Sequence, residues 1–415
     1  MAQKFDIAVL GAGIVGVSSA IHLRRMGLGV VLIDRRGPGE ETSHGNAGII
    51  QREGVHPYLF PRSLPKLIQY GLNLRVDAHY QLSSLLKVAP FLWRYFLNSA
   101  PERAKQTLAA NIALFEQSLI THGALIAASG SGNLIARNGW LAAFRSRASA
   151  RAAESQRNEL LELGLDCALL SAFELSLLEP HLNVGGLEGA VHFRDPWTAS
   201  DPGALTKAYA ALFEREGGVL VEADASAAQR QRGQWQFGEI SANAMVVTLG
   251  PWSKPFLDRL GVSLPMGVKR GYHRHYSTSG GAVLTRPIVD EDHGYVLAPM
   301  AQGMRLTSGA EFAALDAPPS PVQLKRAEPI AKALFPLGEP LESTPWMGAR
   351  PVFPDMRPVI GKLDRLDDAW VNFGHGHHGF TLGPATGLLL AQMITGKTTF
   401  MDPLAFSPAR FLRST

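Results

Sequence analysis

Cysteine is almost absent from this sequence, which has a single one, Cys167, in 415 residues. One cysteine excludes an internal disulfide bond and a cluster of thiolate metal ligands, and a reducing compartment permits such a composition. We therefore expect Cys167 to be a small core residue.

Long apolar runs are missing as well. No uninterrupted apolar stretch reaches the roughly 20 residues that a membrane-spanning helix needs, and the first residues lack the pattern of a secretory signal. We expect a cytoplasmic protein. The segment nearest to a span, residues 82–97, carries Lys87 and Arg94 among leucine and aromatic side chains. We expect it to pack in the core or at a domain interface, and the alternative is a peripheral contact with the inner face of the membrane.

Runs of one charge are absent too. The chain has 40 Lys and Arg against 36 Asp and Glu, a net charge of +4. Because the basic residues are scattered, nothing supports nucleic-acid binding. The length exceeds what one hydrophobic core usually organises, so we expect at least two domains.

A dinucleotide-binding pattern stands at the start of the chain. An apolar strand at residues 5–10 leads into Gly11-Ala12-Gly13-Ile14-Val15-Gly16, a helical segment follows, and a second strand ends at Asp34. In such a pattern Gly11 makes the tight turn, Gly13 lets the backbone approach the pyrophosphate, and Gly16 lets the helix pack on the strand. Asp34 lies about 20 residues on, where a carboxylate accepts hydrogen bonds from ribose hydroxyls. The pattern alone does not separate NAD from FAD.

The next loop favours FAD. It reads Glu41-Thr42-Ser43-His44-Gly45-Asn46-Ala47-Gly48-Ile49-Ile50, where a nicotinamide dehydrogenase would usually proceed to another helix. With this loop the sequence resembles the amino-acid-oxidising FAD family that includes D-amino-acid dehydrogenase small subunits, glycine oxidase and sarcosine oxidase. The Asn-Ala-Gly ending is closer to the D-amino-acid dehydrogenases. The resemblance implies that the loop runs along the pyrophosphate and up to the flavin ring.

Further motifs of this family lie near the C-terminus. Trp346-Met347-Gly348-Ala349-Arg350-Pro351 and Pro354-Asp355-Met356-Arg357-Pro358-Val359-Ile360-Gly361 are similar to its W-x-G-x-R-P and P-D-x-x-P-x-I-G signatures. The stretch Gly374-His375-Gly376-His377-His378-Gly379-Phe380-Thr381 resembles its Gly-His-Gly loop. A helix is expected to follow from about residue 384 to 394. Its N-terminus would face the loop, where the partial positive charge stabilises a reduced flavin.

Arg350 is the main candidate for substrate recognition. A planar guanidinium grips an α-carboxylate with two hydrogen bonds, and the resemblance agrees, because glycine and D-amino-acid oxidases place a substrate-binding arginine in the corresponding motif. A structural salt bridge is the alternative. The resemblance also points to His44, with a role in loop structure as its alternative, and to Tyr272, whose hydroxyl would bind the carboxylate. His377 and His378 complete the predicted catalytic set.

The three C-terminal histidines are not expected to bind a metal. No carboxylate or cysteine accompanies them, and the intervening glycines suit a close backbone approach to a ring. FAD is expected to be non-covalent, because Cys167 lies far in sequence from the C-terminal block. The residues expected to contact FAD are Gly11, Gly13, Ile14, Val15, Gly16, Asp34, Arg35, Thr42, Ser43, His44, Asn46, Ala47, Gly48, Gly250, Trp252, Arg350, Gly374, Gly376, His377, Gly379, Phe380 and Thr381.

The expected fold is α/β (α+β), with a Rossmann-like FAD-binding domain interleaved with a mixed β-sheet substrate-binding or cap domain. We place the FAD-binding domain at residues 1–60, 145–262 and 344–415, and the cap at residues 61–144 and 263–343. Within the cap, Asn138-Gly139 between extended runs predicts a hairpin.

The expected activity is that of an FAD-dependent dehydrogenase that oxidises the Cα–N bond of a small amino or imino acid, such as a D-amino acid, D-proline or hydroxyproline. The hydride passes to flavin N5 and leaves an imine or 2-oxo acid. Alternatives are a glycine- or sarcosine-type oxidase that uses oxygen, a non-catalytic FAD-binding subunit of a larger complex, and a nicotinamide-dependent dehydrogenase. The electron acceptor, whether quinone, partner flavoprotein or oxygen, is left open.

Overall fold

The computed structural model describes residues 3–412 and builds them around two large β-sheets. The first sheet has a parallel centre in the order β10-β2-β1-β13-β22. These strands are β10 (Val219–Glu222), β2 (Val30–Asp34), β1 (Gln3–Leu10), β13 (Ile240–Val247) and β22 (Ala369–Phe373). Antiparallel additions are β11 (Gln229–Gln231), β12 (Gln234–Phe237) and β21 (Val359–Lys362).

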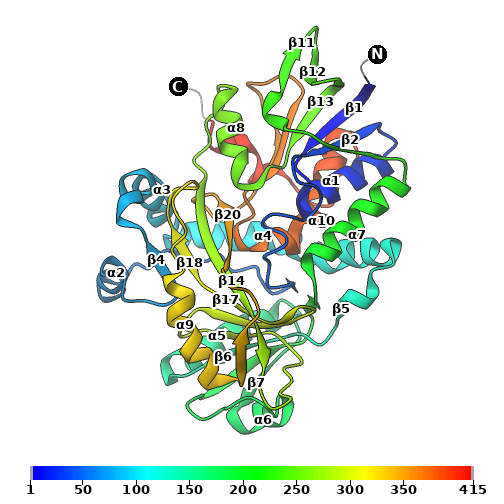
Figure 1. Cartoon of the computed structure of the whole chain (residues 1–415). Coiled ribbons are helices and arrows are strands. Elements are labelled where there is room, and N and C mark those ends of the chain that lie inside the picture. Colours follow the sequence, from blue (N-terminus) through cyan, green and yellow to red (C-terminus); the bar gives the residue numbers. More distant parts are fainter. Residues whose placement is uncertain (1–2, 413–415) are drawn as a thin grey trace.

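Helices cover the first sheet, in the upper part of Figure 1. One apolar cluster joins Val9 and Leu32 of the sheet to Ile21 of α1 and Leu389 of α10, and a second joins Val31 to Phe256 of α8. The parallel strands are therefore buried on both faces, as an all-parallel arrangement requires. The helices involved are α1 (Ile14–Arg25), α4 (Pro101–Ser129), α7 (Pro202–Arg215), α8 (Ser253–Arg259) and α10 (Gly379–Ile394).

The second sheet, in the lower part of Figure 1, is mixed and has eleven strands. Its main path runs β4 (Ala78–Tyr80), β18 (Ala310–Phe312), β14 (Gly267–Thr278), β17 (Gly303–Thr307), β16 (Tyr295–Met300), β15 (Ile288–Asp290), β6 (Trp140–Phe144), β8 (Gly189–Phe193) and β7 (Cys167–Ser171). The strands β19 (Leu337–Pro340) and β20 (Trp346–Val352) also pair with β14. A small third sheet joins β3 (Ile49–Ile50), β9 (Trp197–Ala199) and β5 (Ile135–Ala136).

Further helices flank the second sheet. They are α2 (Leu64–Gly71), α3 (Leu85–Asn98), α5 (Arg147–Glu162), α6 (Ala172–Leu178) and α9 (Val322–Leu334). A buried cluster joins α6 and α9 to the sheet through Leu175 and Leu324. The α/β class with mixed sheets matches the sequence-based expectation.

Sheet pairing places some segments differently from the predicted boundaries. Strands β7 and β8 belong to the eleven-stranded sheet although they fall within residues 145–262, and β20 pairs with β14 although it falls within residues 344–415. The predicted hairpin at Asn138-Gly139 is wrong, because β5 pairs with β9 whereas β6 pairs with β8. A local pattern predicts a strand but not its partner, so the assignment of whole segments to domains stays a prediction.

The helix α4 is, within residues 3–412, the one helix long and apolar enough by length and composition to cross a membrane. Its contacts place it in the protein core instead. It packs on α7 and α10, and Leu114, Phe115 and Leu125 are buried in the main apolar cluster. Ser118 Oγ also donates to the carbonyl of Gln51 at 2.7 Å.

The helix α3 behaves differently from the prediction of core packing. Tyr95 is its only buried residue among those described, and Leu86 and Trp93 are 90% and 62% exposed. The neighbouring α2 has no buried residue and exposes Leu64 and Ile68. These two helices lie together at one side of the molecule in Figure 1.

Candidate active site

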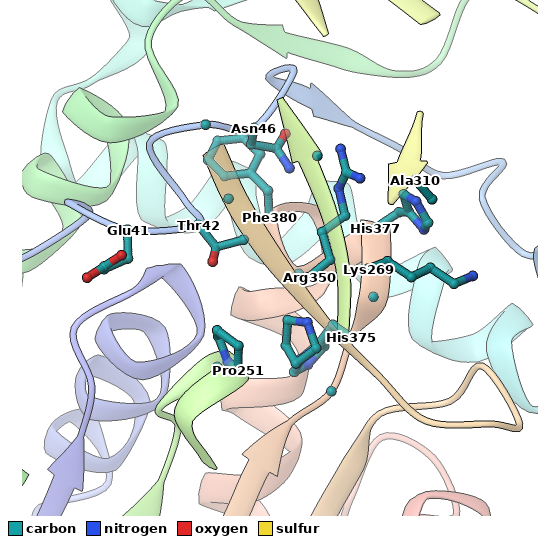
Figure 2. Close-up of a pocket in the computed structure, with 18 of the residues that line it drawn as sticks. Glu41, Thr42, Asn46, Pro251, Lys269, Ala310, Arg350, His375, His377 and Phe380 are labelled. Carbon is teal, nitrogen blue, oxygen red and sulfur yellow. The ribbon is translucent and has the colours of Figure 1, made fainter. Parts of the chain in front are cut away.

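A cavity of about 1150 Å³ is lined by residues of both large sheets. Its walls include the glycine loop before α1, the loop after β2, the C-terminal histidine loop, and the strands β14 and β20. Figure 2 shows part of this lining, with Thr42 and Asn46 on one side and Arg350, His375 and His377 near its centre. Motifs that are more than 300 residues apart in the sequence thus share one cavity.

The glycine loop has the geometry that its sequence predicts. Gly11 has φ +101°, and a Cβ there would lie 2.7 Å from the carbonyl oxygen of Thr248. A Cβ on Gly16 would lie 1.8 Å from the carbonyl oxygen of Gly11, so this glycine allows the helix to approach the strand. A Cβ on Gly13 would meet only Ser43 Oγ, at 3.4 Å, so the cavity is open beside this backbone. The N-terminus of α1 therefore offers an accessible site for phosphate groups.

Asp34 lies at the carboxyl end of β2 and lines the cavity. Its Oδ2 accepts a hydrogen bond from Ala12 N–H at 2.7 Å and its Oδ1 one from Arg36 N–H at 2.8 Å, which fixes the carboxylate beside the glycine loop. The guanidinium of Arg35 lies 4.7 Å from the ring centre of Trp252. Further lining residues of this end, which the sequence did not predict, follow β10: they are Ala223, Asp224, Ala225 and Ser226. The parallel pairing of β10 with β2 brings them there.

The loop after β2 is held by its own polar groups. Ser43 Oγ accepts the N–H of Ile14 at 3.0 Å, Thr42 Oγ1 donates to the carbonyl of Ala349 at 3.0 Å, and Asn46 Oδ1 accepts the N–H of Gly48 at 2.9 Å. These bonds connect the loop to α1 and to β20. The loop is therefore positioned by both ends of the chain.

Most residues predicted to contact FAD line the cavity, and their contacts with FAD stay a prediction. The lining ones are Gly11, Gly13, Ile14, Val15, Asp34, Arg35, Thr42, Ser43, Asn46, Ala47, Gly250, Trp252, Arg350, Gly374, Gly376, His377, Gly379 and Phe380. The others, Gly16, His44, Gly48 and Thr381, are not part of the lining. Gly48 packs on Ala199, and Thr381 Oγ1 donates to the carbonyl of Ile49 at 3.1 Å.

The helix α10 begins five residues earlier than expected, at Gly379, and Pro384 lies inside it. A proline has no N–H, so it leaves the carbonyl four residues before it, that of Phe380, without its helical partner. His122 fills this place, because its Nε2 lies 2.9 Å from Phe380 O while its Nδ1 lies 3.0 Å from the hydroxyl of Tyr209. Since α10 starts next to the histidine loop, its free N–H groups lie at the cavity.

The three C-terminal histidines have different surroundings. His375 Nε2 is bonded to Thr386 Oγ1 at 3.0 Å, and His378 Nδ1 lies 3.1 Å from Gln51 Oε1, outside the cavity lining. His377 lines the cavity, its Nδ1 has no hydrogen-bond partner in the part of the chain that the structure describes, and its ring lies 4.8 Å from that of Tyr58. Burial and the positive charges of Arg350 and Lys269 hold its pKa well below the usual range. His377 is therefore neutral.

Two of the predicted catalytic residues, His44 and Tyr272, do not present a free polar group to the cavity. The ring of His44 lies 6.0 Å from Trp346 and 6.2 Å from His273, outside the cavity lining, so its structural alternative fits better. Tyr272 lines the cavity, but its hydroxyl donates to Glu311 at 2.7 Å and accepts the N–H of Ser320 at 2.7 Å. That hydroxyl is engaged in a buried network and is not available to a substrate carboxylate.

Arg350 reaches into the cavity from β20. A Cβ on Gly271 would lie 2.4 Å from its guanidinium, so the glycine on the neighbouring strand provides the space that the side chain occupies. The guanidinium donates to the carbonyl of Gly309 at 3.2 Å and forms no ion pair with any carboxylate of residues 3–412. Burial lowers its pKa to about 10. The structural salt bridge considered from the sequence is thus not present.

Tyr58, Lys269 and Glu291 are among the ionisable residues of the cavity that the sequence did not predict. Burial and the neighbouring Arg350 lower the pKa of Lys269 to about 7, and its amine donates to the hydroxyl of Tyr95 at 2.9 Å. Strand alternation puts the side chains of Lys269 and Tyr272 on opposite faces of β14, so the sequence contains no signal for Lys269. Its place in the cavity follows from its pairing with Arg350 on β20.

The family model described as FAD dependent oxidoreductase (DAO) matches residues 6–393. The chain belongs to this family. It is 32% identical to a D-amino-acid oxidase of Bradyrhizobium diazoefficiens, over 99% of this chain and 100% of that protein. It is 31% identical to a D-amino acid dehydrogenase of Paramagnetospirillum magneticum, over 94% of this chain and 95% of that protein.

Solved structures share the fold. Glycine oxidase from Geobacillus kaustophilus matches with a TM-score of 0.76 at 20% identity, over 100% of both chains. L-proline dehydrogenase from P. horikoshii matches with a TM-score of 0.76 at 18% identity, over 100% of this chain and 99% of that one. This protein is an FAD-dependent oxidoreductase that acts on amino acids, and the predictions of the family and of FAD as cofactor are confirmed.

The residues of the DAO-family cavity fit FAD. The open backbone at Gly13 and the N-terminus of α1 suit the pyrophosphate, and Asp34 is placed for ribose hydroxyls. The N-terminus of α10 and the histidine loop suit the flavin end. Cys167 lies on β7 and outside this lining.

Proposed function

We propose that this chain removes a hydride from the carbon next to the nitrogen of a small amino or imino acid whose carboxylate is held by Arg350. The observation that carries the proposal is the guanidinium of Arg350, which shares a cavity with the dinucleotide loop and has no carboxylate partner in residues 3–412. A buried cation without a counter-charge is costly, and a bound carboxylate relieves that cost.

The residues of the chain orient the substrate and stabilise charge. Arg350 fixes the carboxylate through two parallel hydrogen bonds and so decides which substituent of Cα faces the flavin. His377 is neutral and lines the cavity, so its imidazole can take part in a hydrogen bond with the substrate amine. The glycine loop, Asp34 and the histidine loop would hold FAD non-covalently, and the cofactor would supply the hydride acceptor. The N-terminus of α10 would favour negative charge at the flavin end.

Anaerobic flavin reduction tests this proposal. D- and L-amino acids, N-methyl amino acids and hydroxyproline epimers are mixed with the holoenzyme, and the loss of oxidised-flavin absorbance is recorded. Bleaching by one of these groups supports the proposal and excludes a non-catalytic FAD-binding subunit. If none of them bleaches a fully loaded flavin, the assignment of Arg350 to a substrate carboxylate is wrong.

We further propose that the reduced enzyme passes its electrons to a membrane quinone and not to oxygen. The support is the exposed surface of α2 and α3, which includes Leu64, Ile68, Leu86 and Trp93. An apolar helix surface of this kind suits a membrane interface. The same cavity that holds Arg350 is lined by Leu67, Leu85 and Leu92 of these segments, which gives a lipid-soluble acceptor an apolar approach.

Vesicle flotation and acceptor assays test the second proposal. The holoenzyme is expected to float with anionic lipid vesicles, whereas Leu86→Glu with Trp93→Glu stays in solution and still reduces its flavin with amino acid. Under air, wild-type turnover with a soluble quinone is expected to exceed peroxide formation at least tenfold. Peroxide formation at the rate of substrate oxidation would identify an oxidase instead.

A further inference from the structure

Glu291 differs from the acidic residues on either side of it. Asp290 accepts a hydrogen bond from Arg145 Nε at 2.7 Å, and Asp292 accepts those of Arg145 N–H at 2.7 Å and Ser149 Oγ at 2.9 Å. Both aspartates thus hold the end of β15 against the start of α5. The carboxylate of Glu291 has neither an ion pair nor a hydrogen bond within residues 3–412, so it has no structural task of this kind.

The side chain of Glu291 is instead directed into the large cavity. It is exposed there, among the lining residues Trp140, Val289 and Val296, which offer it no positive charge. The surrounding protein atoms desolvate this carboxyl and raise the pKa of Glu291 to about 7, and the charges of Asp290 and Asp292 raise it as well, although the side chain stays accessible from the cavity. A ligand that fills the cavity displaces the water around this carboxylate, which is costly unless the ligand brings a cation to it.

The end of the cavity across from Glu291 is positively charged. Arg350 and Lys269 lie there, and the strand order β20-β14-β17-β16-β15 separates Arg350 from the strand that ends beside Glu291 by four strand spacings. At roughly 4.8 Å per spacing, the two backbones are about 19 Å apart. The long side chains of Arg350 and Glu291 bring their charges closer together than their backbones, but no ion pair joins the two residues. Both charges act on Tyr58, because Glu291 raises the pKa of its hydroxyl and Arg350 lowers it.

A ligand that binds at both ends of the cavity needs a carboxylate for Arg350 and a cation for Glu291. This cation must lie farther from the carboxylate than an α-amine does. We propose that Glu291 binds a positively charged group on the substrate side chain, so that the preferred substrates are amino acids with basic side chains such as lysine, ornithine or arginine. This inference rests on the proposed function, because Arg350 must hold the carboxylate.

A binding experiment tests the inference without any turnover. The probes are 6-aminohexanoate, which has a carboxylate and a distant ammonium but no α-amine, and hexanoate, which lacks the ammonium. Titration calorimetry on the holoenzyme is expected to show at least tenfold tighter binding of 6-aminohexanoate. Glu291→Gln, which keeps the shape and removes the charge, is expected to abolish the difference, and the exposed Glu154→Gln is expected to retain it.

Turnover adds a second readout. The wild-type kcat/KM for lysine is expected to be at least tenfold higher than that for norleucine, which has an uncharged side chain of similar length. Glu291→Gln loses that preference, and Glu291→Lys shifts it toward glutamate. The preference for 6-aminohexanoate also fades below about pH 7, where Glu291 takes up a proton while Tyr58 stays neutral because burial raises its pKa.

The outcomes separate this inference from the proposed function. If norleucine bleaches the flavin as readily as lysine and hexanoate binds as tightly as 6-aminohexanoate, the role of Glu291 is refuted while the oxidation of amino acids stands. An equal loss for lysine and norleucine in Glu291→Gln also refutes it. If no amino acid bleaches the flavin, both proposals fail.

Discussion

Lys269 and Arg350 stand directly opposite each other on the paired strands β14 and β20. Side chains opposite each other on antiparallel strands project from the same face of the sheet, so two buried cations flank one part of the cavity, and the described residues provide neither with a carboxylate. Figure 2 shows the two side chains leaving their strands in different directions, with His377 beside them. Each can therefore serve an anionic ligand separately.

Arg350→Lys is expected to lower kcat/KM for amino acid oxidation about 100-fold, because an ammonium cannot replace two parallel hydrogen bonds to a carboxylate. The FAD content should stay unchanged, since the charge at this position is kept. Steady-state kinetics and the ratio of flavin to protein absorbance measure both effects. The exposed Arg326→Lys is the control, and an unaltered kcat/KM in Arg350→Lys would remove Arg350 from substrate binding.

Lys269 is expected to assist carboxylate binding in a pH-dependent way. Its pKa is lowered to about 7, so the amine is charged below that pH and neutral above it. The ratio of wild-type to Lys269→Met kcat/KM for alanine should therefore fall as the pH rises through about 7. Measuring both enzymes from pH 6 to 9 cancels the titration of the substrate amine. A constant ratio would show that the amine has no part in binding.

Gly16→Ala is expected to weaken FAD binding by about 5- to 150-fold. Its new Cβ would lie 1.8 Å from Gly11 O and 2.6 Å from Thr248 Oγ1, so the helix must move away from the strand that positions its N-terminus. Such overpacking costs about 1–3 kcal/mol. Flavin fluorescence during dilution measures the dissociation constant. Gly132→Ala, where a Cβ would meet nothing within 4 Å, should bind FAD as the wild type does.

The cofactor end of the site could be predicted because its signals are local. The glycine loop, Asp34 and the loop after β2 each follow from neighbouring residues, and backbone geometry then requires glycine at Gly11 and Gly16. Arg350 was found through a short motif. The prediction of these residues therefore depends little on which strands pair in the sheets.

The substrate end could not be predicted in the same way, because long-range pairing creates it. Glu291 stands in an acidic turn that looks like a solvated surface loop, and only the pairing of β15 with β6 and β16 turns it inward. The sequence suggests that Tyr272 binds the substrate, but its hydroxyl donates to Glu311, which pairs with Arg270 from another strand. The start of α10 could not be predicted either, because a proline usually stands in the first turn of a helix, whereas His122 stabilises Pro384 inside this one.

His122 leads to a prediction about acid stability. It is buried between α4, α7 and α10, and burial lowers its pKa to about 4 from 6.5. Between these two values the unfolded chain binds a proton that the folded protein does not, so stability falls as the pH falls from about 6.5 to about 4. This one residue accounts for at most about 3 kcal/mol of that loss.

His122→Gln removes the titration and keeps a donor for Phe380 O, which Pro384 leaves without a helical partner. Denaturant unfolding of the holoenzyme between pH 4 and pH 7 should therefore show a slope of stability against pH that is smaller by about one proton in the variant. The exposed His181→Gln provides the matched control and should keep the wild-type slope. Equal slopes in all three proteins would mean that His122 already carries its proton when buried, and its Nδ1 would then have to donate to Tyr209 instead of accepting from it.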